Sequence, residues 1–159
     1  MAGSIAQKER AIVTLTTSGA SLTTGSAGAG NGTADFDARS TGNFPDDMAA
    51  QFELLCQWAT ITGITLNTIA ADLYLLPALD GTNFPDIDTT AGASALPYAA
   101  FVGSFVCTKA PTANTNFRLV SPVVVFNPLL LRPYILNRSG QTISANWTLK
   151  AVGVQAQYT

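Results

Sequence analysis

Of the 159 residues in this chain, 47% are hydrophobic and 11% are charged, and the formal net charge is −2. One domain can bury a core at this length, and a surface with so few charges favours contact with neighbouring subunits. The Lys and Arg residues are scattered, which excludes a basic surface for binding nucleic acid or a membrane. The chain has no histidine, the commonest general base and metal ligand, so we expect neither catalysis nor a cofactor.

The first 34 residues are predicted to form an extended N-terminal arm. Residues 12–17 favour a β-strand, whereas residues 18–33 consist almost wholly of Ser, Gly, Ala and Thr and cannot form a core. We expect the arm to gain order only by adding to a neighbouring sheet or surface, and the predicted contacts are Ile12, Val13 and Leu15. The alternative is a disordered terminus without a role.

Residues 35–159 show short apolar runs separated by turn residues, which predict an all-β domain built as an antiparallel β-sandwich. Within residues 51–60, the two-residue period of a strand places one set of side chains on the core face: Phe52, Leu54, Cys56 and Trp58. Leu55 then lies on the opposite face, where we expect it to form an apolar contact with a partner.

The rest of the domain reads as further strands and turns. The predicted strands cover residues 72–76, 100–107, 117–120, 122–126, 134–137 and 144–154. Gly103 predicts a bulge or a close backbone approach within its strand. The turn at residues 138–141 predicts that the last two strands form a terminal hairpin. The best helical window is a single turn near residues 46–50.

Residues able to carry chemistry are few. Cys56 and Cys107 sit in apolar, strand-like runs and are predicted to be reduced core residues, and Trp58 and Trp147 are predicted to be core anchors. The loop at residues 80–88 is rich in oxygen ligands, but it lacks the alternation and terminal Glu of an EF-hand, so no metal site is predicted there. Its acids are expected to form turns.

Residues 72–84 (DLYLLPALDGTNF), 102–105 (VGSF) and 133–142 (PYILNRSGQT) resemble a group of small virion structural proteins from tailed bacteriophages and prophages. The resemblance covers most of residues 48–150. It implies a β-sandwich of jelly-roll type, mounted on the phage particle as a capsid decoration or cement protein or as a small tail-associated component. It brings no catalytic residues.

The resemblance to virion proteins implies the partners and the location of an assembly protein. We expect contacts with copies of the chain itself, as a dimer or trimer, and with the major capsid protein or another virion protein. The start of the chain has no basic region followed by an apolar one, so we expect synthesis in the host cytoplasm and then a place on the virion, on the capsid in preference to the tail.

A second hypothesis is a carbohydrate-binding or receptor-binding module on a phage tail, fibre or spike. Such a module needs exposed aromatic side chains with polar neighbours near loop ends. The candidates are Tyr74, Phe84, Tyr98 and Tyr134, and burial of these residues would argue against the hypothesis.

Overall fold

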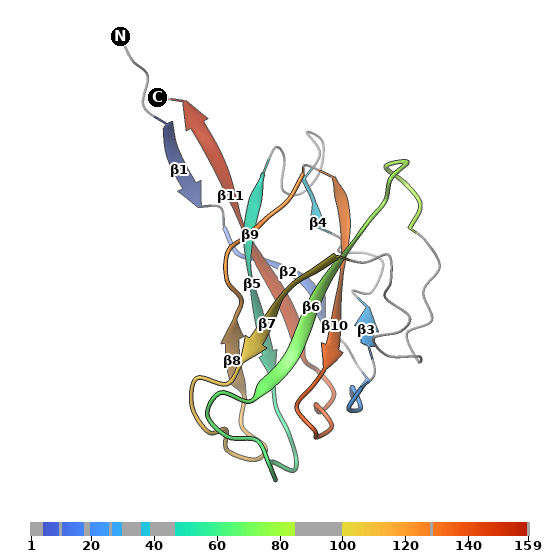
Figure 1. Ribbon diagram of the computed structural model, residues 1–159, viewed down its shortest axis with the longest axis vertical. Helices are drawn as coiled ribbons and strands as arrows, with labels where there is room; N and C mark the ends of the chain where they lie inside the picture. Colours follow the sequence, from blue (N-terminus) through green and yellow to red (C-terminus); the bar gives the residue numbers. More distant parts are fainter. Residues whose placement is uncertain are drawn as a thin grey trace.

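The computed structural model describes residues 5–9, 11–17, 20–25, 27–29, 36–38, 47–84, 100–127 and 129–158. Within these ranges the regular structure is entirely β (Figure 1). The strands are β1 (Ile5–Glu9), β2 (Val13–Thr17), β3 (Ala27–Ala29), β4 (Phe36–Asp37), β5 (Ala49–Cys56), β6 (Ile69–Pro77), β7 (Ala100–Val106), β8 (Phe117–Val120), β9 (Val124–Val125), β10 (Leu130–Asn137) and β11 (Thr148–Tyr158).

The strands form two antiparallel sheets that pack face to face as a sandwich, as the sequence predicted. Sheet I has the order β1-β11-β5-β8, with β2 also paired to β11 and β9 also paired to β5. Sheet II has the order β3-β10-β6-β7, with β4 also paired to β10. Beyond the body of the sandwich, β1 and the end of β11 continue as a two-stranded ribbon (Figure 1).

Strand pairing in this chain is nested. The first strands, β1 and β2, pair with the last strand, β11, and the next two, β3 and β4, pair with β10. Inside these, β5 pairs with β8 and β9, and β6 pairs with β7. Each sheet is therefore assembled from segments that are far apart along the chain.

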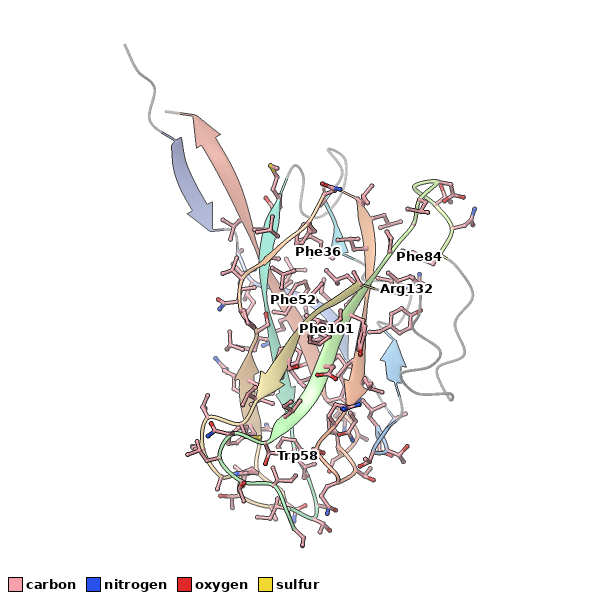
Figure 2. All side chains as sticks on the ribbon, viewed as in Figure 1. Phe36, Phe52, Trp58, Phe84, Phe101 and Arg132 are labelled. Atoms are coloured by element: carbon pink, nitrogen blue, oxygen red, sulfur yellow. The ribbon has the colours of Figure 1, made fainter. Side chains whose placement is uncertain are left out.

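The core between the sheets follows the predicted two-residue period of β5. Phe52, Leu54, Cys56 and Trp58 are all buried, which confirms the predicted core face. Sheet II contributes Leu73 and Leu75 from the opposite side. Phe36 packs against Phe52 with ring centroids 5.9 Å apart, and both rings lie between the sheets (Figure 2).

The predicted terminal hairpin is wrong. β10 belongs to sheet II and β11 belongs to sheet I, so the segment between them crosses from one sheet to the other. In that segment, Ile143 forms single β-bridges with Leu22 and Trp58. A hairpin would have placed both strands in one sheet, whereas the crossing lets each strand bury its apolar face against the other layer.

The single helical turn predicted near residues 46–50 is also wrong within the described part. Ala49 and Ala50 begin β5 and pair with Val125 and Val124 of β9. Residue 46 lies outside the described residues. Pairing with β9 satisfies the backbone groups that a short helix would have left to solvent.

Gly103 lies at the predicted bulge. Leu73 pairs with Gly103 and Tyr74 pairs with Phe101, so Val102 is the extra residue in β7. A Cβ atom placed on Gly103 would lie 3.5 Å from Cδ of Pro122, which follows β8. The bulge therefore accompanies a close approach between the edge strands of the two sheets.

Candidate partner interface

The predicted contacts at Val13 and Leu15 lie in β2, which pairs with β11 of the same chain. Leu15 is 0% exposed and belongs to the chain's own core, while the half-buried Val13 packs against that core. This corrects the prediction that Leu15 meets a partner: the strand does add to a sheet, but the sheet belongs to the same chain. Pairing of β2 with the chain's own sheet is favoured over pairing with a partner, because association with another molecule loses translational and rotational freedom and pairing within one chain does not.

Ile12 is the one predicted arm contact that stays accessible. Its side chain is 53% exposed, just before β2 begins. It lines a shallow hollow of about 110 Å³ on sheet I together with Val120, Val152 and the side chains of Glu53 and Lys150. Ile12 is therefore positioned to contribute apolar surface to a contact on sheet I.

Leu55 lies on the outer face of β5, where the sequence placed it. It is half-buried between the fully buried Leu54 and Cys56. Its cross-strand neighbours are Arg118 of β8 and Thr148 of β11. A contact between Leu55 and a partner remains a prediction.

Three valines at the edge of sheet I were missed by the sequence reasoning. Val120, Val123 and Val125 are 51%, 58% and 76% exposed, and we call them the valine edge. The signal was present, because a run of consecutive apolar residues in a strand must turn every second side chain away from the core. Residues 122–126 were predicted to form a strand, with no face assigned, and of the three valines in that run only Val124 is buried.

The charged groups beside this surface form ion pairs across three strands. The carboxylate of Glu53 in β5 forms a salt bridge with Arg118 of β8, with Nε 3.3 Å from Oε2, and another with Lys150 of β11, with Nζ 3.6 Å from Oε1. The Glu53 side chain is 12% exposed, whereas that of Arg118 is 65% exposed. One shielded carboxylate thus holds two more exposed cations on the outer face of sheet I.

Replacement of Glu53 by Gln is expected to lower the free energy of unfolding by about 1 kcal/mol, because both cations lose their shared carboxylate. Urea unfolding of Glu53→Gln, Arg118→Met and the double variant would measure the coupling. We expect the coupling to shrink in 1 M salt, where the Debye length is about 3 Å. A coupling of zero at low salt would contradict the role given to the pair.

The loop at residues 80–88 is described only as far as residue 84. There, the carboxylate of Asp80 forms a turn, as predicted. Its Oδ1 accepts from the backbone N–H groups of Thr82 and Asn83 at 2.8 and 2.7 Å, and Oδ2 accepts from the Asn83 side-chain amide at 2.8 Å. These bonds, led by the Asn83 backbone N–H, lower the pKa of Asp80 below its usual value.

The aromatic residues of the receptor-binding hypothesis lie mostly on the outer face of sheet II. Tyr134 is buried, which argues against that hypothesis, and Tyr98 lies outside the described residues. Tyr74 is half-buried, and burial raises its pKa, with the Asp72 carboxylate adding to the effect and Arg138 opposing it. The guanidinium of Arg132 stacks 4.0 Å over the half-buried ring of Phe84 (Figure 2).

The two cysteines are buried and free, as predicted. Burial raises the pKa of both thiols, and at Cys56 the neighbouring Cys107 raises it further. Trp58 and Trp147 are also buried, which confirms them as core residues.

Comparison with known proteins adds no family. No protein-family model matches the chain, and no curated protein matches it.

In the part of the chain that the structure describes, no helix is long and apolar enough to span a membrane. The same ranges contain no cluster of three or more His, Cys, Asp or Glu side chains able to hold a metal ion.

Proposed function

We propose that this chain is a structural component of a bacteriophage virion, a capsid decoration or cement protein that stabilises the shell through subunit contacts. The observation that carries the proposal is the exposed valine edge, with Ile12, on the outer side of sheet I. Isolated exposed apolar residues are ordinary, but neighbouring ones on a weakly charged chain favour a protein interface.

The nested strand pairing supports a jelly-roll assignment for the sandwich. If β1 with β2, β3 with β4, and β8 with β9 are each counted as one strand position, successive positions alternate between sheets I and II except at β6 and β7 in the centre of the nest. Two Greek keys wound in this way make up the jelly roll, which is used in viral capsid and lectin domains. The fold alone is compatible with several functions. The exposed surface supports assembly, as does the resemblance of residues 72–84, 102–105 and 133–142 to virion proteins.

The proposed mechanism is adhesive. Each contact through the valine edge buries only a few side chains and is weak by itself. Contacts repeated around a shell add up, because once one subunit contact has formed the next forms at a high effective concentration. The partners are copies of the chain and the major capsid protein.

Co-sedimentation with shells prepared without the chain tests the proposal. We expect stoichiometric binding that raises the temperature at which the shells open. The variant Val120→Asp/Val123→Asp should bind at least tenfold more weakly, since it places charges in the apolar contact. Leu66→Asp is the matched control, because Leu66 is 56% exposed in the turn before β6 and should leave binding unchanged.

Circular dichroism and thermal melting would establish that the variants remain folded. If the native chain ignored shells and bound polysaccharide or a cell surface, the decoration proposal would fail. That result would favour the tail- or fibre-associated receptor-binding module. Equal loss of shell binding in the valine variant and the Leu66 control would remove the valine edge as the contact.

A further inference from the structure

The bulge in β7 brings an aromatic and a polar side chain onto the same face of sheet II. Phe101 and Ser104 are three residues apart, a separation that points side chains to opposite faces of a regular strand. Val102, the extra residue of the bulge, removes this mismatch: the two side chains lie opposite Tyr74 and Asp72 of β6, respectively. Because these partners are two residues apart, all four side chains share the outer face of the sheet. Bulges that redirect a side chain are common beside functional sites.

Phe101 supplies an exposed aromatic ring at this face. The residue is 58% exposed and lies on β7 (Figure 2). Tyr74 holds the ring from one side, with the two ring centroids 5.6 Å apart and the ring planes inclined by 64°. A single exposed apolar residue is ordinary and needs no partner by itself. The feature that distinguishes Phe101 is the fixed polar group beside it.

This polar group is centred on Asp72, whose side chain is 12% exposed. Its Oδ1 accepts from the Ser104 hydroxyl at 2.6 Å, and its Oδ2 lies 3.6 Å from Nε of Arg138. The Arg138 backbone N–H donates to the Ala70 carbonyl at 2.9 Å, which fixes its backbone to β6. The Arg138 side chain is 52% exposed, so its guanidinium presents N–H donors to solvent, and the Ser104 oxygen keeps its capacity to accept. Groups fixed in this way lose little freedom when they bind a ligand.

The chemistry of this face matches an uncharged ligand that is apolar on one side and carries hydroxyl groups around its edge. The ion pair of Asp72 with Arg138 is neutral as a whole, so it offers no net charge to a phosphate or a carboxylate. Two residues along a strand span about 6–7 Å, so one sugar unit can reach both the aromatic ring and the polar network. The C–H groups of a sugar ring pack on an aromatic face, and its hydroxyls bond to guanidinium and hydroxyl groups.

We propose that the outer face of sheet II binds a sugar ring of an uncharged glycan. The C–H face of the ring packs on Phe101, while its hydroxyls accept from Arg138 and donate to Ser104. The inference goes beyond the proposed function and does not rest on it, because the valine edge belongs to sheet I. The sequence did not identify this site, since Phe101 was not among the predicted aromatic candidates and the predicted Tyr134 is buried.

Binding by a single copy of the chain is expected to be weak. Contact with one sugar unit buries little surface, and the ligand must still lose translational and rotational freedom. We therefore expect dissociation constants in the millimolar range for oligosaccharides, which sets the choice of method. Copies held side by side on a surface would bind a polysaccharide with much higher avidity.

An NMR titration of the isotope-labelled chain tests the site, with hexasaccharides of glucose, mannose and N-acetylglucosamine as probes. We expect at least one probe to shift the backbone amides of residues 72–74 and 101–104 in a saturable manner. Phe101→Leu should lower the affinity about tenfold, because leucine is apolar but has no ring face, and Phe101→Trp should preserve it. Leu66→Ala is the matched control, since Leu66 is 56% exposed in the turn before β6 and should leave the affinity unchanged.

The absence of saturable shifts with all three probes would overturn the inference, as would equal affinity of Phe101→Leu and the native chain. If Phe101→Leu lost binding to shells instead of binding to sugar, the face would be a protein contact and the inference would also fall. Sugar binding that depends on Phe101 in a chain that ignores shells would have the opposite meaning: the sugar site would stand and the decoration function would fall. Thermal melting would establish that the variants remain folded.

Discussion

Replacement of Leu15 by alanine is expected to lower the free energy of unfolding by about 2–5 kcal/mol, the usual cost of a cavity left by a buried leucine. Leu15 is completely buried in the core, and its strand β2 pairs with β11. Loss of this side chain weakens the attachment of β2 as well as the packing. Urea denaturation followed by Trp fluorescence would measure the change, because both tryptophans are buried.

The matched control is Ile12→Ala, three residues earlier in the same segment. Ile12 is mostly exposed, so its truncation should change stability by no more than about 0.5 kcal/mol. If Leu15→Ala proved as mild as Ile12→Ala, β2 would not be part of the folded core in solution, and the prediction of an arm that orders only on a partner would return.

Replacement of Asn137 by alanine is expected to cost about 3 kcal/mol, because it breaks a buried hydrogen-bond network and leaves its partners unsatisfied. The Asn137 side-chain amide donates to the carbonyls of Leu22 and Gln141, each at 2.8 Å. Its oxygen accepts from the Ser139 backbone N–H at 3.0 Å and from the Ser139 hydroxyl at 2.8 Å. The Ser139 hydroxyl in turn accepts from Nε1 of Trp58 at 3.1 Å.

This network joins both sheets to the N-terminal segment, so its loss should lower the cooperativity of unfolding as well as the free energy of unfolding. Thermal and urea unfolding of Asn137→Ala would measure both. Asn116→Ala, at an exposed loop position, should stay within about 0.5 kcal/mol of the native chain. A similar small effect at Asn137 would mean that water replaces the amide and that the network is dispensable.

The alternation within a strand was readable from the sequence, and the choice of partner strand was not. Phe52, Leu54 and Cys56 reach the core because period two is a local property of the chain. The supposed hairpin of β10 and β11 failed because strand pairing depends on which faces must be covered in the whole sandwich. Turn signals between two strands cannot report whether the chain stays in one sheet or crosses to the other.

The candidate interface was predicted only in part, again because strand pairing cannot be read from local sequence. Leu55 was placed on the outer face by strand alternation. Ile12 and Leu15 were predicted together as arm contacts, and Leu15 was misplaced because nothing local shows that β2 pairs with β11 of the same chain. The valine edge was overlooked because its apolar run resembles a buried strand until the position of β9 at the edge of sheet I is known.

The nested pairing has a consequence for how the protein is made. β2 and β5 both pair with β11, which follows every other described strand along the chain, so sheet I cannot close until β11 has been synthesised. The innermost pair, β6 and β7, can meet early, and β5 can pair with β8 and β9 before β10 and β11 are made. Contacts between distant segments slow folding, and the apolar strands stay exposed in the interval. The outer face of sheet I, which carries the valine edge, is therefore complete only after β11 has been added.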